Sequence, residues 1–105
     1  MSRERTLKLL EMLDKQPQDT FLLYALGMEE LGLQKLEDAA GLFKKVLHIQ
    51  PDNVACYYQL GKICEQLGAE RDAVIHFEEG MRLANLKGDK KTSAEFRTAL
   101  DELLF

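Results

Sequence analysis

The sequence matches itself at a fixed offset of 34 residues, and no other feature constrains the fold as strongly. Leu26-Gly27 corresponds to Leu60-Gly61, and Phe43 corresponds to Phe77. The same offset also pairs Leu23 with Tyr57, Tyr24 with Tyr58, Leu33 with Leu67, Ala39 with Ala73 and Leu47 with Met81. A repeat of this length predicts small helical units that stack, because one unit cannot bury its apolar face alone.

The residue types at the repeated positions favour closely packed helices. Gly and Ala at the small positions allow neighbouring helices to approach, and the two phenylalanines fill the space between layers. Pro51 is expected to end a helix. Asp52 or Asn53 can then cap the helix that follows, and Asp19 or Thr20 can cap the helix that begins the first repeat.

Helical patterns also flank the repeats. Residues 3–15 have a wide apolar face that includes Leu7, Leu10 and Leu13, so we expect an N-terminal half-repeat helix there. Residues 91–104 are expected to form a C-terminal capping helix. The predicted organisation is a single domain over 1–105, made of 3–15, repeat 1 at 20–53, repeat 2 at 54–87, and 91–104.

This pattern resembles the tetratricopeptide repeat. That family has a large residue, two spacers, Leu-Gly and, further on, Ala, three spacers, Phe and a late Pro. The first repeat carries Leu23, Leu26, Gly27, Ala39, Phe43 and Pro51, and the second carries Tyr57, Leu60, Gly61, Ala73 and Phe77. The C-terminal part, with Lys87-Gly88-Asp89 and Glu95-Phe96, also looks like a group of small stand-alone bacterial tetratricopeptide proteins.

The chain departs from the family pattern at a few positions. Glu30 and Cys64 stand where an aromatic residue is usual, Asn85 stands where Pro is usual, and Gln34 stands where the turn usually has Gly. These departures concern local turn geometry. The resemblance implies an all-α fold: a right-handed superhelix of stacked antiparallel helix pairs, an α-solenoid of about six helices.

Composition argues against several classes of function. The formal net charge of −4 disfavours nucleic-acid binding, which depends on Lys and Arg at the phosphates. No apolar run reaches about 18 residues, so membrane insertion is not expected. The N-terminus lacks a secretory signal, so we expect a cytoplasmic protein. Cys56 and Cys64 would lie roughly 12 Å apart along one helix, too far to form a disulfide, and both are expected to be reduced.

No group of residues predicts catalysis. Ser2 and Ser93 lie outside any nucleophile motif. A zinc site built from Cys56, Cys64 and His76 would lack the closely spaced ligand pair that such sites use. We therefore expect a protein that is not an enzyme and that uses no cofactor and no metal.

The resemblance implies that a ligand lies on the first helix of each repeat, which lines the concave surface in this family. Tyr24 and Tyr58 are the leading candidates because they recur at the repeat offset on a face that the core is not expected to need. Phe21 can belong either to the groove or to the core. The candidate peptide-binding residues are Phe21, Tyr24, Met28, Tyr58, Gln59 and Lys62.

The expected function is a protein–protein interaction module or scaffold that binds a peptide or helix of a partner protein in its concave groove. The alternative is a structural subunit that forms a homo-oligomer, or docks on a neighbour, through the apolar residues Leu103, Leu104 and Phe105. A clamp for the C-terminal carboxylate of heat-shock chaperones is not expected. The matching positions hold Tyr24, Met28, Gln59, Asp89 and Ser93, none of which fits that clamp.

Overall fold

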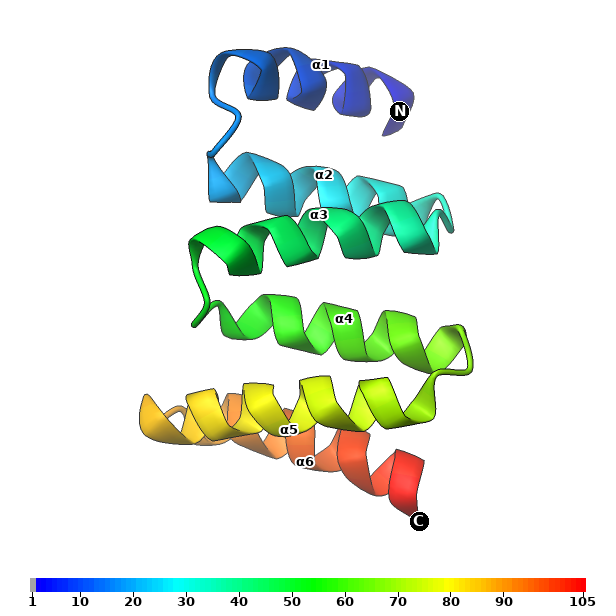
Figure 1. Ribbon diagram of the computed structural model, residues 1–105, viewed down its shortest axis with the longest axis vertical. Coiled ribbons are helices and arrows are strands. Elements are labelled where there is room, and N and C mark those ends of the chain that lie inside the picture. Colours follow the sequence, from blue (N-terminus) through cyan, green and yellow to red (C-terminus); the bar gives the residue numbers. More distant parts are fainter. Residues whose placement is uncertain (1) are drawn as a thin grey trace. The chain divides into compact units, whose positions relative to one another are not determined.

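The computed structural model describes residues 2–105, and this part of the chain contains six helices and no strand (Figure 1). The all-α repeat fold predicted from the sequence is confirmed. None of the helices in residues 2–105 combines the length and apolarity needed to cross a membrane. The helices are α1 (Ser2–Lys15), α2 (Thr20–Gly32), α3 (Leu36–Ile49), α4 (Val54–Gln66), α5 (Glu70–Leu86) and α6 (Lys90–Leu104).

The chain divides into two compact units, Met1–Pro51 and Asp52–Phe105. In the first unit α2 packs against both α1 and α3, and in the second unit α5 packs against both α4 and α6. The predicted single domain, with its repeat boundaries, stays a prediction.

Polar side chains cap the N-termini of three helices, α2, α4 and α6. Asp19 accepts a hydrogen bond from the Leu22 amide at 3.1 Å, and Asn53 accepts one from the Cys56 amide at 3.2 Å. These two residues are therefore the caps among the alternatives that the sequence left open. Each bond satisfies a backbone donor that has no partner within its own helix.

A glycine on one helix makes room for a phenylalanine on the next. A Cβ atom at Gly27 would lie 2.7 Å from Cε1 of Phe43, and a Cβ atom at Gly61 would overlap the ring of Phe77. Both phenylalanines are fully buried. The repeated Gly and Phe therefore form one packing unit, in which the missing side chain of the first residue is filled by the ring of the second.

A third glycine–phenylalanine pair joins α5 to α6. A Cβ atom at Gly80 would overlap the ring of Phe96, which is also fully buried. The two residues are 16 apart in sequence, as are Gly61 and Phe77. This pair lies outside the 34-residue register, so the repeat comparison does not find it.

The N-terminal helix uses a narrower face than its sequence predicts. Leu9 is buried with Leu22 and Leu26, and Leu13 is half-buried against them. Leu7 and Leu10 were expected to belong to the buried face, but they are 54% and 47% exposed. In α1 the buried position of Leu9 matches Phe43 at the repeat offset. Within its unit α1 packs mainly against α2, whereas α2 packs against two helices, so α1 buries less of its apolar surface.

Three tight turns reverse the chain in the same way. Gln34, Gly68 and Gly88 all have positive φ, at 61°, 79° and 71°. The residue after each of them donates its amide to a carbonyl five positions back, at distances of 3.0, 2.8 and 2.9 Å. Such turns end helices by pairing carbonyls that would otherwise lack donors. The turn before α6 is thus of the kind that joins α2 to α3 and α4 to α5.

Replacing Gln34 with Gly is expected to stabilise the protein by about 1 kcal/mol. A left-handed conformation costs a residue with a Cβ atom about 1–2 kcal/mol, and the greater freedom of glycine in the unfolded chain offsets part of the gain. The midpoint of urea denaturation should rise. Gly68→Gln is the reciprocal control at the repeat-matched turn, and it should lower the midpoint. A Gln34→Gly protein that is less stable than the parent would contradict this account.

Candidate functional site

Each of the two candidate tyrosines, Tyr24 and Tyr58, packs its ring against a buried phenylalanine ring. The ring of Tyr24 lies 5.2 Å from that of Phe43, and the ring of Tyr58 lies 5.8 Å from that of Phe77 and 5.6 Å from that of Phe96. Both tyrosines are half-buried. The expectation that the core does not need this face is therefore wrong, because one side of each ring packs on the core. The other side remains accessible.

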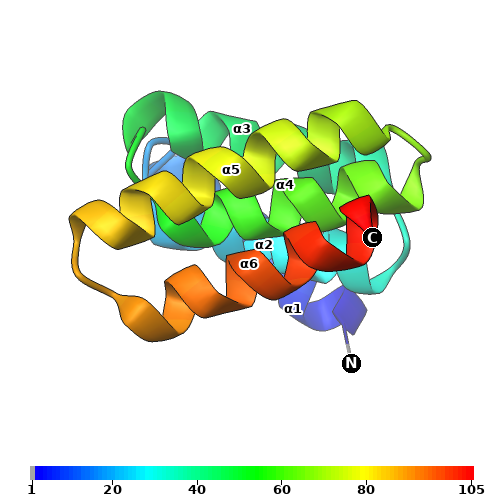
Figure 2. The ribbon, with the colours of Figure 1, turned by 90° about the horizontal axis from the view of Figure 1, so that it is seen from below.

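A cleft of about 330 Å³ lies on this accessible side of Tyr58, within the second unit. Figure 2 shows α6 joined to α5 through the turn before it, and the cleft is formed by α4, by α6 and by that turn. Its lining residues are Val54, Ala55, Tyr58, Gln59, Lys87, Asp89, Thr92, Glu95 and Phe96. The cleft therefore has an aromatic and aliphatic floor with polar and charged groups around it.

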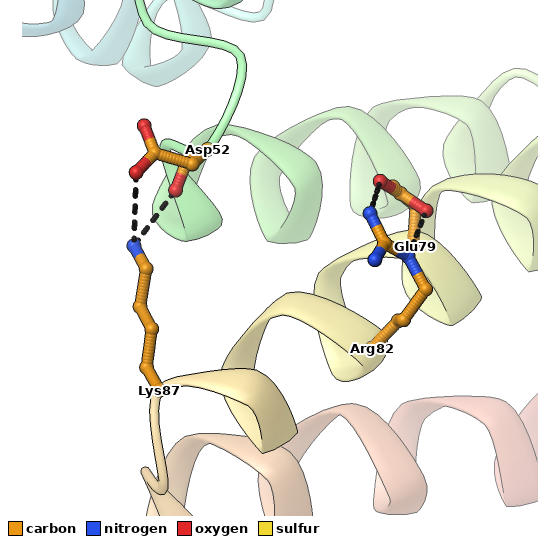
Figure 3. Close-up of polar contacts among 4 residues, drawn as sticks. All are labelled: Asp52, Glu79, Arg82 and Lys87. Atoms are coloured by element: carbon orange, nitrogen blue, oxygen red, sulfur yellow. Dashed lines mark hydrogen bonds and ion pairs between the residues drawn. The ribbon is translucent and has the colours of Figure 1, made fainter.

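Lys87 holds the turn before α6 against the start of α4. Its ammonium group donates a hydrogen bond to the Asp52 carbonyl oxygen at 2.8 Å and lies 3.8 Å from Oδ2 of the same residue (Figure 3). The two residues are 35 apart in sequence. Asp52 thus compensates the charge of Lys87 at one end of the cleft.

Asp89 caps α6 at the same end. Its carboxylate accepts hydrogen bonds from the Thr92 hydroxyl at 2.7 Å and from the Thr92 amide at 3.1 Å. These two bonds, followed by the charge of Lys91, lower the pKa of Asp89 below its usual value. The group therefore remains a carboxylate at neutral pH.

Lys62 lies beside the cleft and not in its wall. Its ammonium group is 5.8 Å from the centre of the Tyr58 ring and 3.8 Å from Oε1 of Glu65. The first distance is within the range of a cation–π interaction. Lys62 therefore lies next to Tyr58 without closing the cleft.

The structure brings the predicted residues of the second repeat together. Tyr58 and Gln59 line the cleft, and the Lys62 ammonium lies 5.8 Å from the centre of the Tyr58 ring. In the first repeat, Phe21 was expected to belong either to the groove or to the core. Its side chain is 78% exposed, so it does not belong to the core. Met28 is 38% exposed. The hypothesis that the residues of both repeats form one binding surface stays a prediction.

Sequence reasoning missed two charged residues of the cleft. Glu95 and Lys87 reach it only because α6 folds back beside α4. Glu95 directly precedes Phe96, so the Gly80–Phe96 pair would have indicated its place. No local signal links Lys87 to Asp52.

Other polar groups of the second unit lie outside the cleft. Arg82 donates from two nitrogens to Glu79, at 2.9 and 2.6 Å, on the surface of α5 (Figure 3).

Burial raises the pKa of the Cys56 thiol to about 12, so this thiol stays protonated at neutral pH. Within residues 2–105, no cluster of three or more His, Cys, Asp or Glu side chains could hold a metal ion.

Replacing Asp89 with Asn should reduce the sensitivity of the protein to acid. Because the pKa of Asp89 is lowered on folding, its carboxylate stabilises the folded state above the ordinary value of 3.8, and this contribution is lost as the pH falls further. Asn also caps helices but does not titrate. Thermal unfolding measured from neutral pH to below 3.8 should show the Tm difference between the two proteins shrinking with acidity. A difference that does not change with pH would rule out a charged cap.

Comparisons with known proteins cover most of the chain. No protein-family model matches the sequence. The solution structure of a tetratricopeptide repeat domain protein from Salinibacter ruber is similar, with 33% identity, a TM-score of 0.78 and coverage of 84% of this chain and 89% of that one. A Bordetella parapertussis protein of known structure shares the fold, with 23% identity, a TM-score of 0.83 and coverage of 93% and 85%.

A longer eukaryotic protein contains a similar segment. RNA polymerase II-associated protein 3 of Rattus norvegicus is 38% identical over 78 residues, which cover 66% of this chain. The chain spans only 12% of the length of that protein.

Proposed function

Because the chain belongs to the tetratricopeptide repeat family, we propose that it is an interaction module that binds a peptide or helix of a partner protein. The observation that carries this proposal is the cleft beside Tyr58. The residues that the family register identified as ligand-facing, Tyr58 and Gln59, meet the side chain of Phe96 there. A concave apolar floor with a few polar groups is typical of a binding site.

The floor suits a side chain of a partner peptide. Tyr58 presents a large ring that is already held against the buried ring of Phe96, so binding costs little loss of side-chain freedom. Gln59 adds an amide that can donate and accept hydrogen bonds. On α2 we propose Phe21, Tyr24 and Met28 as further contacts, since Phe21 and Met28 are exposed and Tyr24 is the repeat counterpart of Tyr58.

We assign no catalytic role to the chain. Its two cysteines are free thiols, which fits a reducing compartment and supports a cytoplasmic location. The similarity to the Salinibacter ruber domain supports a bacterial source.

Self-association is the second candidate function. Phe105 and Leu104 are 99% and 56% exposed, and adjoining apolar residues can dock on another copy. Light scattering at several concentrations tests this directly. A dimer that disappears when residues 103–105 are removed would favour assembly over peptide binding.

The peptide proposal is tested by filling the cleft with an uncharged side chain. Ala55 lines the cleft and is exposed, so Ala55→Gln should weaken binding of peptides selected on the parent protein by at least about tenfold, or about 1.4 kcal/mol. Ala94→Gln is the matched control, because Ala94 is exposed on α6 and does not line the cleft. Affinities would be measured by fluorescence polarisation.

Circular dichroism should show both variants folded as the parent. Equal affinities of all three proteins would show that the peptides bind elsewhere.

A further inference from the structure

The charged groups around the Tyr58 cleft do not balance. Lys87 is the cation in the wall of the cleft, and Asp52 compensates it through contacts at 2.8 and 3.8 Å. Asp89 is a carboxylate with Lys91 close enough to interact with it. Glu95 also lines the cleft, and in the described part of the chain no ion pair involves it. The carboxylate of Glu95 is therefore an uncompensated negative charge at the edge of the cleft.

This carboxylate adjoins the apolar floor. Glu95 and Phe96 are consecutive on α6 and both line the cleft, opposite Tyr58 and Gln59 on α4. A ligand carboxylate or phosphate placed there would meet like charge. A lysine or arginine side chain would instead lay its methylene groups on the accessible side of the Tyr58 ring and bring its cation to Glu95. Arginine fits best, because its planar group also stacks on aromatic rings.

From this arrangement we propose that the cleft selects a partner segment with an apolar residue next to a lysine or arginine. The apolar side chain packs on Val54, Ala55 and the accessible side of Tyr58, and the basic side chain pairs with Glu95. The inference rests on the proposed function, since it names the chemistry of the peptide that the same cleft binds.

Two synthetic peptide pools test the charge preference. Both have a central leucine surrounded by mixed uncharged residues, and the residue after the leucine is Arg in one pool and Glu in the other. The parent protein should bind the Arg pool about tenfold more tightly at low salt, and the ratio should fall as salt is added. Glu95→Gln should remove the preference, and Glu95→Lys should reverse it.

The control has the same change of net charge outside the cleft. Glu78 is exposed on α5, so Glu78→Lys should keep the preference for the Arg pool. If Glu78→Lys reverses the preference as Glu95→Lys does, the effect comes from overall charge and the inference is overturned.

The remaining outcomes separate this inference from the proposal beneath it. If the parent binds both pools equally and Ala55→Gln abolishes both, the cleft binds peptides but does not select charge. The inference then fails while the proposed function stands. If the parent binds neither pool, although display selection yields peptides that Ala55→Gln rejects, the inference again fails alone. If no peptide binds in a manner that depends on Ala55, both fail.

Discussion

Replacing Phe96 with Ala should lower the free energy of unfolding by about 3–5 kcal/mol, the usual cost of removing a buried aromatic ring. Phe96 is fully buried among Ala73, Phe77, Ala99 and Leu100, and its ring contacts those of Tyr58 and Phe77. The variant leaves a cavity where α4, α5 and α6 meet. Urea denaturation followed by circular dichroism measures the loss.

Phe21→Ala is the matched control for this measurement. Phe21 is 78% exposed in the first turn of α2, so its removal should change stability by no more than about 0.5 kcal/mol. If the two variants lost the same stability, Phe96 would not be a core residue, and α6 would be an appendage of the second unit.

Replacing Gly61 with Ala should cost about 2–3 kcal/mol. The added methyl group would overlap the ring of Phe77, which is fully buried and cannot move aside without displacing α5. Gly41→Ala is the matched control on α3. A Cβ atom there meets nothing within 4 Å, so this variant should gain about 0.5–1 kcal/mol from helix propensity.

A double-mutant cycle isolates the cause of the loss. Phe77→Leu alone leaves a cavity, and Gly61→Ala alone creates a clash, so the combination should be more stable than the sum of the two losses predicts. Additive losses would mean that Gly61 is needed for a reason other than the space occupied by Phe77.

The sequence predicts the helices well because the repeat records how they pack. Gly27 with Phe43 and Gly61 with Phe77 recur at one offset, since each small residue admits the ring of the next helix. Prediction becomes weaker towards the end of the chain. The turn at Gly88 is of the kind found within a repeat, so α6 does not continue the 34-residue register. A comparison at that offset therefore does not identify Gly80 as a packing position.

The candidate site could be predicted only in part, for a related reason. Tyr58 and Gln59 lie on a helix whose ligand-facing positions the family register defines. Glu95 and Lys87 reach the cleft through the turn before α6, and their approach to α4 depends on tertiary structure. The repeat contains the contact of Tyr58 with Phe77, but its contact with Phe96, 38 residues away, lies outside the repeat.

Phe96 belongs to the core and also supports Tyr58 at the cleft, so binding is linked to the motion of α6. Single helices of repeat proteins can open while the remainder stays folded. When α6 opens, Phe96 leaves and the cleft is lost with it. A molecule that occupies the cleft therefore holds α6 closed, by a free energy that grows with the logarithm of its concentration above the dissociation constant. Backbone amides of α6 would then exchange with solvent more slowly in the complex, although the ligand touches only the first half of that helix.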